Sequence, residues 1–93
     1  MVDVSNERVA VLTGAAGGLG QAFALRLAAT GYQLLLTDRA SCEETVRLVT
    51  AAGGKAKALN CDLSDANDVQ KFAADAIQLM GRVDVLVNNA AYM

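Results

Sequence analysis

The sequence predicts an α/β fold in which four strands alternate with three helices in the order β-α-β-α-β-α-β. Short, mostly apolar stretches recur along the chain, and segments with apolar residues at helical spacing lie between them. Strands that are apolar at nearly every position are typical of parallel sheets, which are buried on both faces. The connections are long enough for parallel crossovers, and right-handed crossovers predict the strand order 3-2-1-4.

The first part of the chain is expected to hold two strands with a helix between them. Strands are expected at residues 9–12 and 32–37, and the helix starts directly from a cluster of glycines that follows the first strand. Thr30-Gly31 is expected to close this helix, because Gly31 fits the left-handed position that commonly follows a helix.

A second helix is expected from Ser41 to the glycines at 53–54. Ser41 and Glu44 have the spacing of a capping box, with Ser41 as the N-cap and Glu44 at the third helical position. Residues 55–61 alternate between apolar and polar side chains, which predicts a shorter third strand.

A third helix and a fourth strand complete the pattern. Ser64 or Asp65 is expected to cap the helix, its apolar residues recur at helical spacing, and Gly81 ends it. Residues 83–87 predict the fourth strand. We expect a cleft at the carboxyl ends of the first and fourth strands, where the strand order reverses.

Composition restricts the class of protein. The chain has 93 residues, of which 54% are hydrophobic and 19% charged, enough for one small domain with a core. Its net charge of −2 and the lack of a basic run argue against nucleic-acid binding as the main function. The first seven residues are polar and acidic, unlike a targeting peptide, and no apolar run approaches membrane-spanning length.

The cysteines point to a reducing compartment. Cys42 and Cys61 are 19 residues apart and form no CxxC pair, and the sequence contains no histidine. A Cys/His metal site is therefore not expected. We interpret the cysteines as two reduced thiols of a cytoplasmic protein.

The stretch from Arg8 to Gly20 organises the chain, because it predicts a strand, a glycine-rich turn and a helix in direct succession. Glycines let backbone N–H groups come close to a phosphate, and the N-terminus of a helix adds unpaired N–H groups and a positive dipole end. This arrangement commonly binds the pyrophosphate of a dinucleotide. A glycine-rich loop alone also fits a plain strand-to-helix turn. The rest of the chain must therefore distinguish a dinucleotide site from such a turn.

Asp38 is the second feature of the sequence that indicates a dinucleotide site. It lies 18 residues after Gly20, at the end of the second strand. A dinucleotide fold places an acidic side chain there to accept hydrogen bonds from the adenosine ribose, and a carboxylate repels a 2′-phosphate. We therefore expect NAD rather than NADP, although Arg39 offers a side chain that can stack on adenine or hold a phosphate. The alternative for Asp38 is a solvated turn residue.

Four stretches occur along the chain in this order: Thr13-Gly14-Ala15-Ala16-Gly17-Gly18-Leu19-Gly20, Asp38, Asp62-Leu63 and Val87-Asn88-Asn89-Ala90-Ala91. In this order they resemble the TGxxxGxG loop, the cofactor-selecting position, the acidic-apolar pair and the NNAG motif of the short-chain dehydrogenase/reductase family, and the resemblance covers essentially all 93 residues. It implies a Rossmann-type sheet that stops before a fifth strand, so that residues 1–93 form an N-terminal NAD(P)-binding half-domain.

The resemblance also implies which residues bind the cofactor. The adenine would lie beside Asp62 and the backbone of Leu63, and Asn89, followed by Ala90, would contact the ribose region. Asn88 has a structural role in such proteins, tying strands together. The loop residues expected at the pyrophosphate and neighbouring ribose are Gly14, Ala15, Ala16, Gly17, Gly18 and Leu19.

The chain departs from the family in two places. Ala91 stands where the family often has glycine, which narrows the site. The loop also fits the TGxxGxxG pattern of the extended branch, whereas residues 83–89 favour the compact branch.

The second departure is that the sequence lacks the catalytic residues of the family. The resemblance implies a serine and a Tyr-x-x-x-Lys pair, with the tyrosine as general acid/base. Tyr92 is not that tyrosine, because the sequence ends at Met93 and no lysine follows at the required spacing. We expect the NAD-preferring, cofactor-binding part of an oxidoreductase acting on an alcohol or carbonyl, inactive by itself.

The fourth strand is expected to be an open, apolar edge, which favours self-association, element swapping or pairing with a separate polypeptide. The competing explanation for the open edge is that this sequence is a shortened form of a complete enzyme. Two other functions stay open: a non-catalytic nucleotide-binding or self-associating module, and another Rossmann-type protein such as a methyltransferase. The Asn88-Asn89-Ala90 stretch argues against the methyltransferase.

Overall fold

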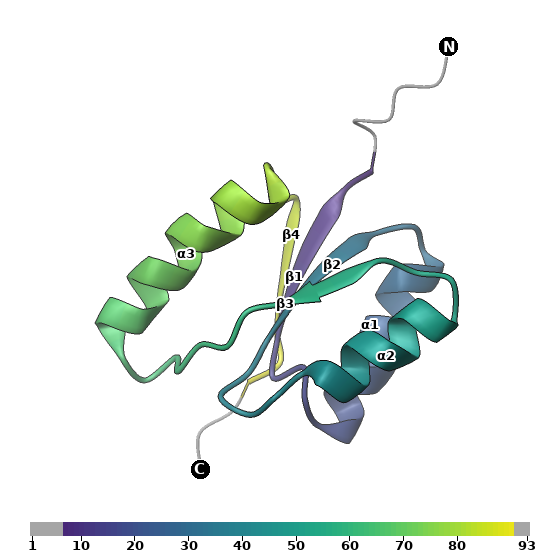
Figure 1. Cartoon of the computed structure of the whole chain (residues 1–93), viewed down its shortest axis with the longest axis horizontal. Helices are drawn as coiled ribbons and strands as arrows, with labels where there is room; N and C mark the ends of the chain where they lie inside the picture. Colours follow the sequence, from purple (N-terminus) through teal and green to yellow (C-terminus); the bar gives the residue numbers. More distant parts are fainter. Residues whose placement is uncertain (1–6, 91–93) are drawn as a thin grey trace.

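The computed structural model describes residues 7–90 and confirms the predicted order of strands and helices. The four strands are parallel and lie in the order β3-β2-β1-β4 (Figure 1). The elements are β1 (Val9–Thr13), α1 (Gly18–Ala29), β2 (Gln33–Thr37), α2 (Glu43–Ala51), β3 (Ala56–Ala58), α3 (Ala66–Met80) and β4 (Val85–Asn88).

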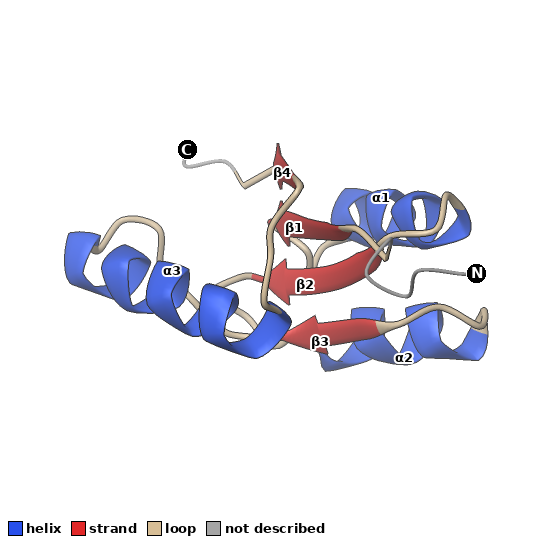
Figure 2. Cartoon of the chain, turned by 90° about the horizontal axis from the view of Figure 1, so that it is seen from above, coloured by secondary structure: helices blue, strands red, loops and turns tan. Residues whose placement is uncertain are grey.

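The sheet lies between two unequal helical layers. Figure 2 shows α1 and α2 together on one face and α3 alone on the other. The strands β1 and β2 are buried along almost their whole length, as expected for the centre of a parallel sheet. The larger core lies under α1 and α2 and consists of Ala10, Leu12, Ala15, Ala24, Leu34, Leu36, Cys42 and Val49. A smaller cluster of Val11, Leu35 and Ala76 lies under α3.

The register brings the carboxyl ends of three strands to one edge of the sheet. Thr13 in β1 pairs with Thr37 in β2 on one side and with Asn88 in β4 on the other. The segments that follow these strands therefore start next to one another, although they are far apart in the sequence.

Both outer strands are shorter than the sequence predicts. Residues 55–61 were expected as one strand, but β3 covers only Ala56–Ala58. Beyond it the backbone stays attached to β2 through hydrogen bonds from Leu59 N–H to Leu36 O and from Cys61 N–H to Asp38 O. In β4, pairing begins two residues late, at Val85.

The predicted N-cap of the second helix is wrong by one residue. Cys42, not Ser41, precedes the first turn of α2. The Ser41 hydroxyl accepts a hydrogen bond from the Glu43 N–H at 3.2 Å. The Glu44 carboxylate does not complete a capping box, because Arg47, three residues later on the same helix, binds it at 2.8 and 2.5 Å.

The other predicted helix ends are confirmed. Asp65 is the N-cap of α3, and its carboxylate accepts hydrogen bonds from the N–H groups of Asn67 and Asp68. Gly81 ends α3 in the left-handed conformation, with φ of 80°. Thr30 is the C-cap of α1, and Gly31 follows it with φ of 105°.

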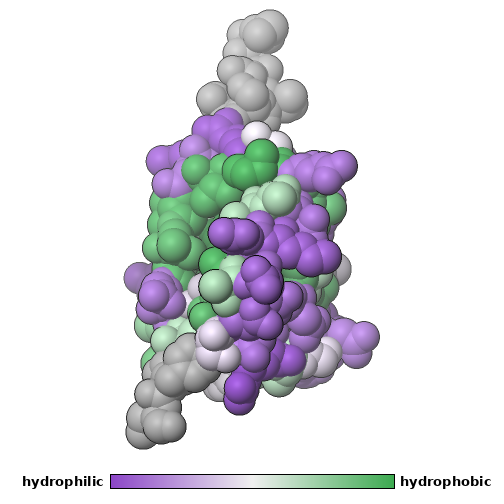
Figure 3. Space-filling view, turned by 90° about the vertical axis from the view of Figure 1, so that its left-hand side faces the viewer, coloured by the Kyte–Doolittle hydropathy of each residue, from purple (hydrophilic) through white to green (hydrophobic). Residues whose placement is uncertain are grey.

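The α3 side of the sheet leaves apolar side chains uncovered. Ile77 of α3 is 55% exposed and Leu86 of β4 is 63% exposed. A groove of about 350 Å³ runs between α3 and strands β1 and β4, with a predominantly apolar lining. Figure 3, which views the molecule from the α3 side, shows hydrophobic surface gathered over one part of this face and hydrophilic surface beside it. Within residues 7–90, no helix is long and apolar enough to cross a membrane.

The first turn of α1 lies directly against the end of β1. A Cβ placed on Gly20 would be 2.1 Å from the Gly14 carbonyl oxygen and 2.8 Å from the Ala15 Cα. Both neighbours are backbone atoms, so a side chain would displace the loop or the helix. Only glycine permits this approach.

Replacing Asp65 tests the capping assignments. We expect Asp65→Ala to lower the free energy of unfolding by about 1 kcal/mol, because two N–H groups of α3 lose their acceptor. Ser41→Ala is the matched control and should cost less than half as much, since Ser41 lies outside the N-cap position. Urea denaturation of both variants measures the difference, and equal losses would contradict the assignment.

Replacing Gly20 tests the close approach of α1 to β1. We expect Gly20→Ala to cost about 3 kcal/mol or more, because the added methyl group meets backbone atoms. Gly18→Ala adds the same group where, apart from the adjacent backbone, no atom of the described residues lies within 4 Å, and it should change stability by less than about 0.5 kcal/mol. Thermal unfolding followed by circular dichroism compares the two. Similar stability of both variants would show that the loop adapts freely.

Candidate functional site

The glycine-rich loop connects β1 to α1 and exposes the start of the helix. Gly17 is the N-cap of α1, it provides no side chain to cap the first turn, and the first turn contains no acidic residue. The first N–H groups of a helix have no partner within the helix and carry partial positive charge. Gly17, Gly18 and Leu19 are all exposed. This end of α1 therefore suits an anion supplied from outside.

The glycines of the loop have two different roles. Gly14 has φ of +65°, and a Cβ there would lie 2.9 Å from the Ala90 nitrogen and 3.0 Å from the Asn89 Nδ2. Gly14 and Gly20 are thus required by packing within the protein. Apart from the adjacent backbone, no atom of the described residues lies within 4 Å of a Cβ added to Gly17 or Gly18. Their open side leaves room for a ligand to approach the backbone.

Thr13 joins the loop to the end of β4. Its hydroxyl donates to Asn88 Oδ1 at 2.8 Å and accepts from the N–H groups of Asn89 at 2.9 Å and Ala90 at 3.0 Å. The Asn89 side-chain amide donates to the Gly14 carbonyl at 3.2 Å. Asn89 and Ala90, both expected at the cofactor, therefore lie beside the first glycine of the loop. Asn88 links β4 to β1, as the resemblance implies.

Asp38 binds the loop directly. One carboxylate oxygen accepts from the Ala16 N–H at 3.0 Å, and the other accepts from the Ala40 N–H at 3.1 Å. Each carboxylate oxygen has two acceptor positions, so these bonds leave acceptor capacity for ribose hydroxyls. Asp38 is half-buried, whereas its neighbour Arg39 is exposed.

Asp62 and Leu63 are brought to the same edge of the sheet. The hydrogen bond from Cys61 N–H to Asp38 O, 3.1 Å long, holds the segment after β3 against the end of β2. Asp62 Oδ1 accepts from both the N–H and the hydroxyl of Ser64, at 3.0 and 2.6 Å. Leu63 lines the end of the apolar groove on the α3 side.

The buried thiols do not suit nucleophilic chemistry. Burial, with a smaller contribution from the negative charge of Asp38, raises the pKa of Cys42 to about 11. Burial is also the main cause that raises the pKa of Cys61, and the charges of Asp68, Asp62 and Asp65 add to it. Both groups are therefore neutral thiols at pH 7.

Sequence reasoning missed three residues that shape the site. Thr13 was noticed only as part of a motif. Thr45 donates its hydroxyl to the Ala15 carbonyl at 2.7 Å. Asn60 donates to the carbonyls of Arg39 and Ala40 at 3.2 and 3.0 Å. A polar residue at or shortly after the end of a strand, or a threonine in the first turn of a helix, is the sequence signal for such contacts, but it does not identify the partner.

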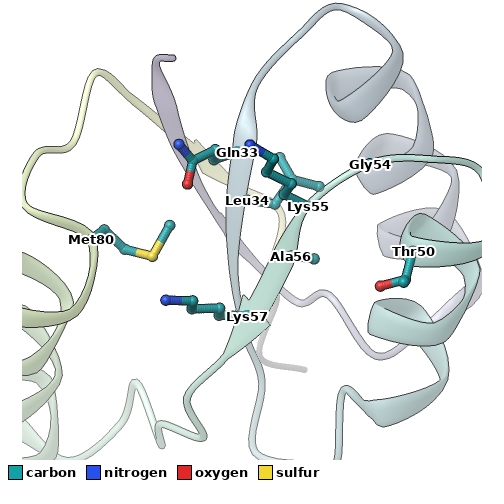
Figure 4. Close-up of a pocket in the computed structure, with 8 residues that line it drawn as sticks. All are labelled: Gln33, Leu34, Thr50, Gly54, Lys55, Ala56, Lys57 and Met80. Carbon is teal, nitrogen blue, oxygen red and sulfur yellow. The ribbon is translucent and has the colours of Figure 1, made fainter. Parts of the chain in front are cut away.

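A second hollow, of about 320 Å³, lies around β3 and away from the loop (Figure 4). Figure 4 shows Lys57 and Met80 on one side of β3 and Thr50 on the other. Its lining includes the amino ends of β2 and β3 and no residue of the glycine-rich loop. Lys55 at its rim is paired with Glu7 at 2.7 Å. It is therefore separate from the candidate site.

The structure places all twelve expected cofactor residues at the carboxyl edge of the sheet, in the loop after β1, in the first turn of α1 or in the segments after β2, β3 and β4. Ala91 and Tyr92, which the sequence also singled out, lie outside the described residues. The expected residues are Gly14, Ala15, Ala16, Gly17, Gly18, Leu19, Asp38, Arg39, Asp62, Leu63, Asn89 and Ala90.

Comparison with known proteins finds the same fold and the same family. Residues 8–93 match the family model described as short chain dehydrogenase. A short-chain oxidoreductase of metagenomic origin, solved in complex with NADP, is 41% identical and has a TM-score of 0.88 over 92% of this chain. NAD+-bound xylitol dehydrogenase is 33% identical, with a TM-score of 0.88 over 97% of this chain.

Two curated relatives differ in length. The short-chain reductase protein NovJ of Streptomyces niveus is 44% identical over 96% of this chain, which covers 35% of that protein. The short-chain dehydrogenase/reductase homolog YusS of Bacillus subtilis is 36% identical over 90% of this chain, which covers 80% of that protein. The chain also spans 40% of the NADP complex and 35% of xylitol dehydrogenase. Its Rossmann-type sheet, its glycine-rich loop and these matches show that the chain belongs to the short-chain dehydrogenase/reductase family.

Proposed function

We propose that residues 1–93 form an NAD-preferring, dinucleotide-binding half-domain of a short-chain dehydrogenase/reductase. The observation behind this proposal is that the exposed start of α1 and the Asp38 carboxylate are held together at one edge of the sheet. A dinucleotide has the matching chemistry, because its pyrophosphate is an anion and its ribose hydroxyls are hydrogen-bond donors.

The residues present fit such a ligand. The open faces of Gly17 and Gly18 would receive the pyrophosphate at the backbone of α1. Asp38 would accept from the adenosine ribose. Asp62 and Leu63 would lie at the adenine, and Asn89 would lie at the ribose nearer β4. When bound, the nicotinamide would supply hydride-transfer chemistry to an alcohol or carbonyl substrate.

The preference for NAD rests on charge. A 2′-phosphate would bring its negative charge next to the Asp38 carboxylate, and like charges at this range repel. Arg39 is adjacent and exposed, so its cation is available to offset part of this repulsion. Solved relatives are described with NADP in one case and with NAD+ in another. Asp38 supports NAD for this chain.

The chain alone would bind and not catalyse. The resemblance implies a serine and a Tyr-x-x-x-Lys pair, and the 93 residues contain no lysine after Lys71. A proton donor or acceptor for the alcohol or carbonyl would therefore come from elsewhere in a complete enzyme.

We propose self-association through β4 as a further property. In the described sheet, β4 pairs with β1 alone, and Leu86 is 63% exposed. An uncovered edge strand beside an apolar groove favours pairing with another chain.

The two cysteines, buried and not joined in a disulfide, support a cytoplasmic location.

The alternative is a non-catalytic nucleotide-binding or self-associating module, which would use the same exposed start of α1. Catalytic activity restored by a separate polypeptide would favour the enzyme, and nucleotide binding without such activity would favour the module.

Cofactor binding is the direct test. Titration calorimetry should give weak, saturable binding of NAD and NADH by the chain, and Asp38→Ala should lower the affinity about tenfold because the ribose acceptor is lost. Asp75→Ala is the matched control, since it removes a carboxylate on α3 that pairs with Lys71. Absence of binding by folded chain would contradict the proposal.

Self-association is tested by light scattering. We expect dimers or larger species at high concentration and mainly monomer for Leu86→Lys, because a charge at the β4 edge opposes pairing. Leu79→Lys is the control, as Leu79 is 41% exposed on α3 but does not line the groove. Monodisperse wild-type monomer at every concentration would rule out this property.

A further inference from the structure

The loop is held from behind by a buried threonine of α2. Thr45 lies in the first turn of α2 and is 1% exposed. Its hydroxyl donates to the Ala15 carbonyl at 2.7 Å. Ala15 itself is 0% exposed, so water does not compete for this carbonyl.

The peptide between Ala15 and Ala16 is fixed at both of its polar atoms. Its carbonyl accepts from Thr45, and its N–H donates to Asp38 Oδ2 at 3.0 Å. The preceding N–H, that of Ala15, donates to the Thr37 carbonyl at 3.1 Å. These three bonds attach the loop to the end of β2 and the start of α2.

We propose that Thr45 is a positioning residue that orients the Ala15–Ala16 peptide and, through it, the Asp38 carboxylate that selects the cofactor. This proposal rests on the proposed function for its effect on cofactor choice. Its structural part, the orientation of the peptide, does not.

The physical reason is the planarity of the peptide group. The carbonyl and the N–H of one peptide point in opposite directions, so fixing one fixes the other. Without the Thr45 hydroxyl, the buried Ala15 carbonyl keeps no donor in the part of the chain that the structure describes, and rotation of the peptide toward another donor becomes favourable. That rotation turns the Ala16 N–H away from Asp38. Of its two bonds within residues 7–90, the carboxylate then keeps the one to the Ala40 N–H.

If the Asp38 carboxylate is held less firmly, the preference for NAD over NADP should decrease. Binding of NAD weakens, because Asp38 must be ordered again to accept from the ribose. Binding of NADP weakens less, because a carboxylate that can rotate away repels the 2′-phosphate less strongly. Loss of the Thr45 hydroxyl should therefore narrow the preference for NAD, and general loosening of the fold would weaken both ligands alike.

Three variants of the full chain separate these effects. Thr45→Val removes the hydroxyl and keeps the shape of the side chain, and Thr45→Ser keeps the hydroxyl. Thr37→Val is the control for removing a buried hydroxyl, since Thr37 is 0% exposed and its Oγ1 has no hydrogen-bond partner among the described residues.

Amide hydrogen exchange measured by NMR on the ligand-free chain is the first readout. We expect the Ala16 amide to exchange about tenfold faster in Thr45→Val than in the wild type, with little change in Thr45→Ser and Thr37→Val. Unchanged exchange at Ala16 in Thr45→Val would overturn the proposal, whether or not the chain binds a dinucleotide.

Titration with NAD and NADP is the second readout. We expect Thr45→Val to raise the Kd for NAD about tenfold and to narrow the ratio of the two Kd values at least threefold, with Thr45→Ser close to wild type. Equal weakening of both ligands would overturn the link to cofactor choice. A wild-type chain that binds neither ligand would refute the proposed function and the link to cofactor choice, and the exchange measurement would still decide the role of Thr45.

Discussion

The Thr13 hydroxyl makes every hydrogen bond that a hydroxyl can make: one as donor to Asn88 Oδ1 and two as acceptor from the N–H groups of Asn89 and Ala90. It lies at the last position of β1, where the central strand gives way to the glycine-rich loop. Thr13 is 75 to 77 residues away in sequence from the three residues that it binds, and this one side chain sets the spacing between the loop and the end of β4. The Gly14 contacts with Asn89 and Ala90 depend on that spacing.

The same edge is closed on its other side by β2 and α2. Asp38 and Thr45 bind the two polar atoms of one loop peptide, so the loop is anchored on both flanks of β1. At Gly17 and Gly18, apart from the adjacent backbone, no atom of the described residues lies within 4 Å of an added Cβ. Hydrogen bonds therefore hold the first part of the loop in place, and the glycines that follow stay open to a ligand. Such an arrangement lowers the entropic cost of binding an anion at the start of α1.

The order of elements and the positions of the site residues could be predicted because they follow from local patterns. Apolar runs predicted β1 and β2, and Asp65 and Gly81 marked the ends of α3. The predicted capping box at Ser41 failed for a reason that spacing does not reveal, since Arg47 binds the Glu44 carboxylate that the box would use. Thr45 was missed because its partner, Ala15, lies 30 residues away and is reached only after α1 and α2 pack side by side on the sheet.

The two faces of the sheet differ in how well they are packed, and this difference bears on ligand binding. The loop, Asp38 and Thr45 belong to the well-packed side, where α1 and α2 cover the sheet. Asp62 and Leu63 lead into α3, which contributes only Ala76 to the fully buried core. The groove beneath α3 also contains Leu63 at one end. A dinucleotide that contacts both Asp38 and Leu63 would connect the well-packed face under α1 and α2 to the less well-packed face under α3. Its binding energy would then also stabilise the position of α3, because anything that binds only the folded arrangement stabilises it.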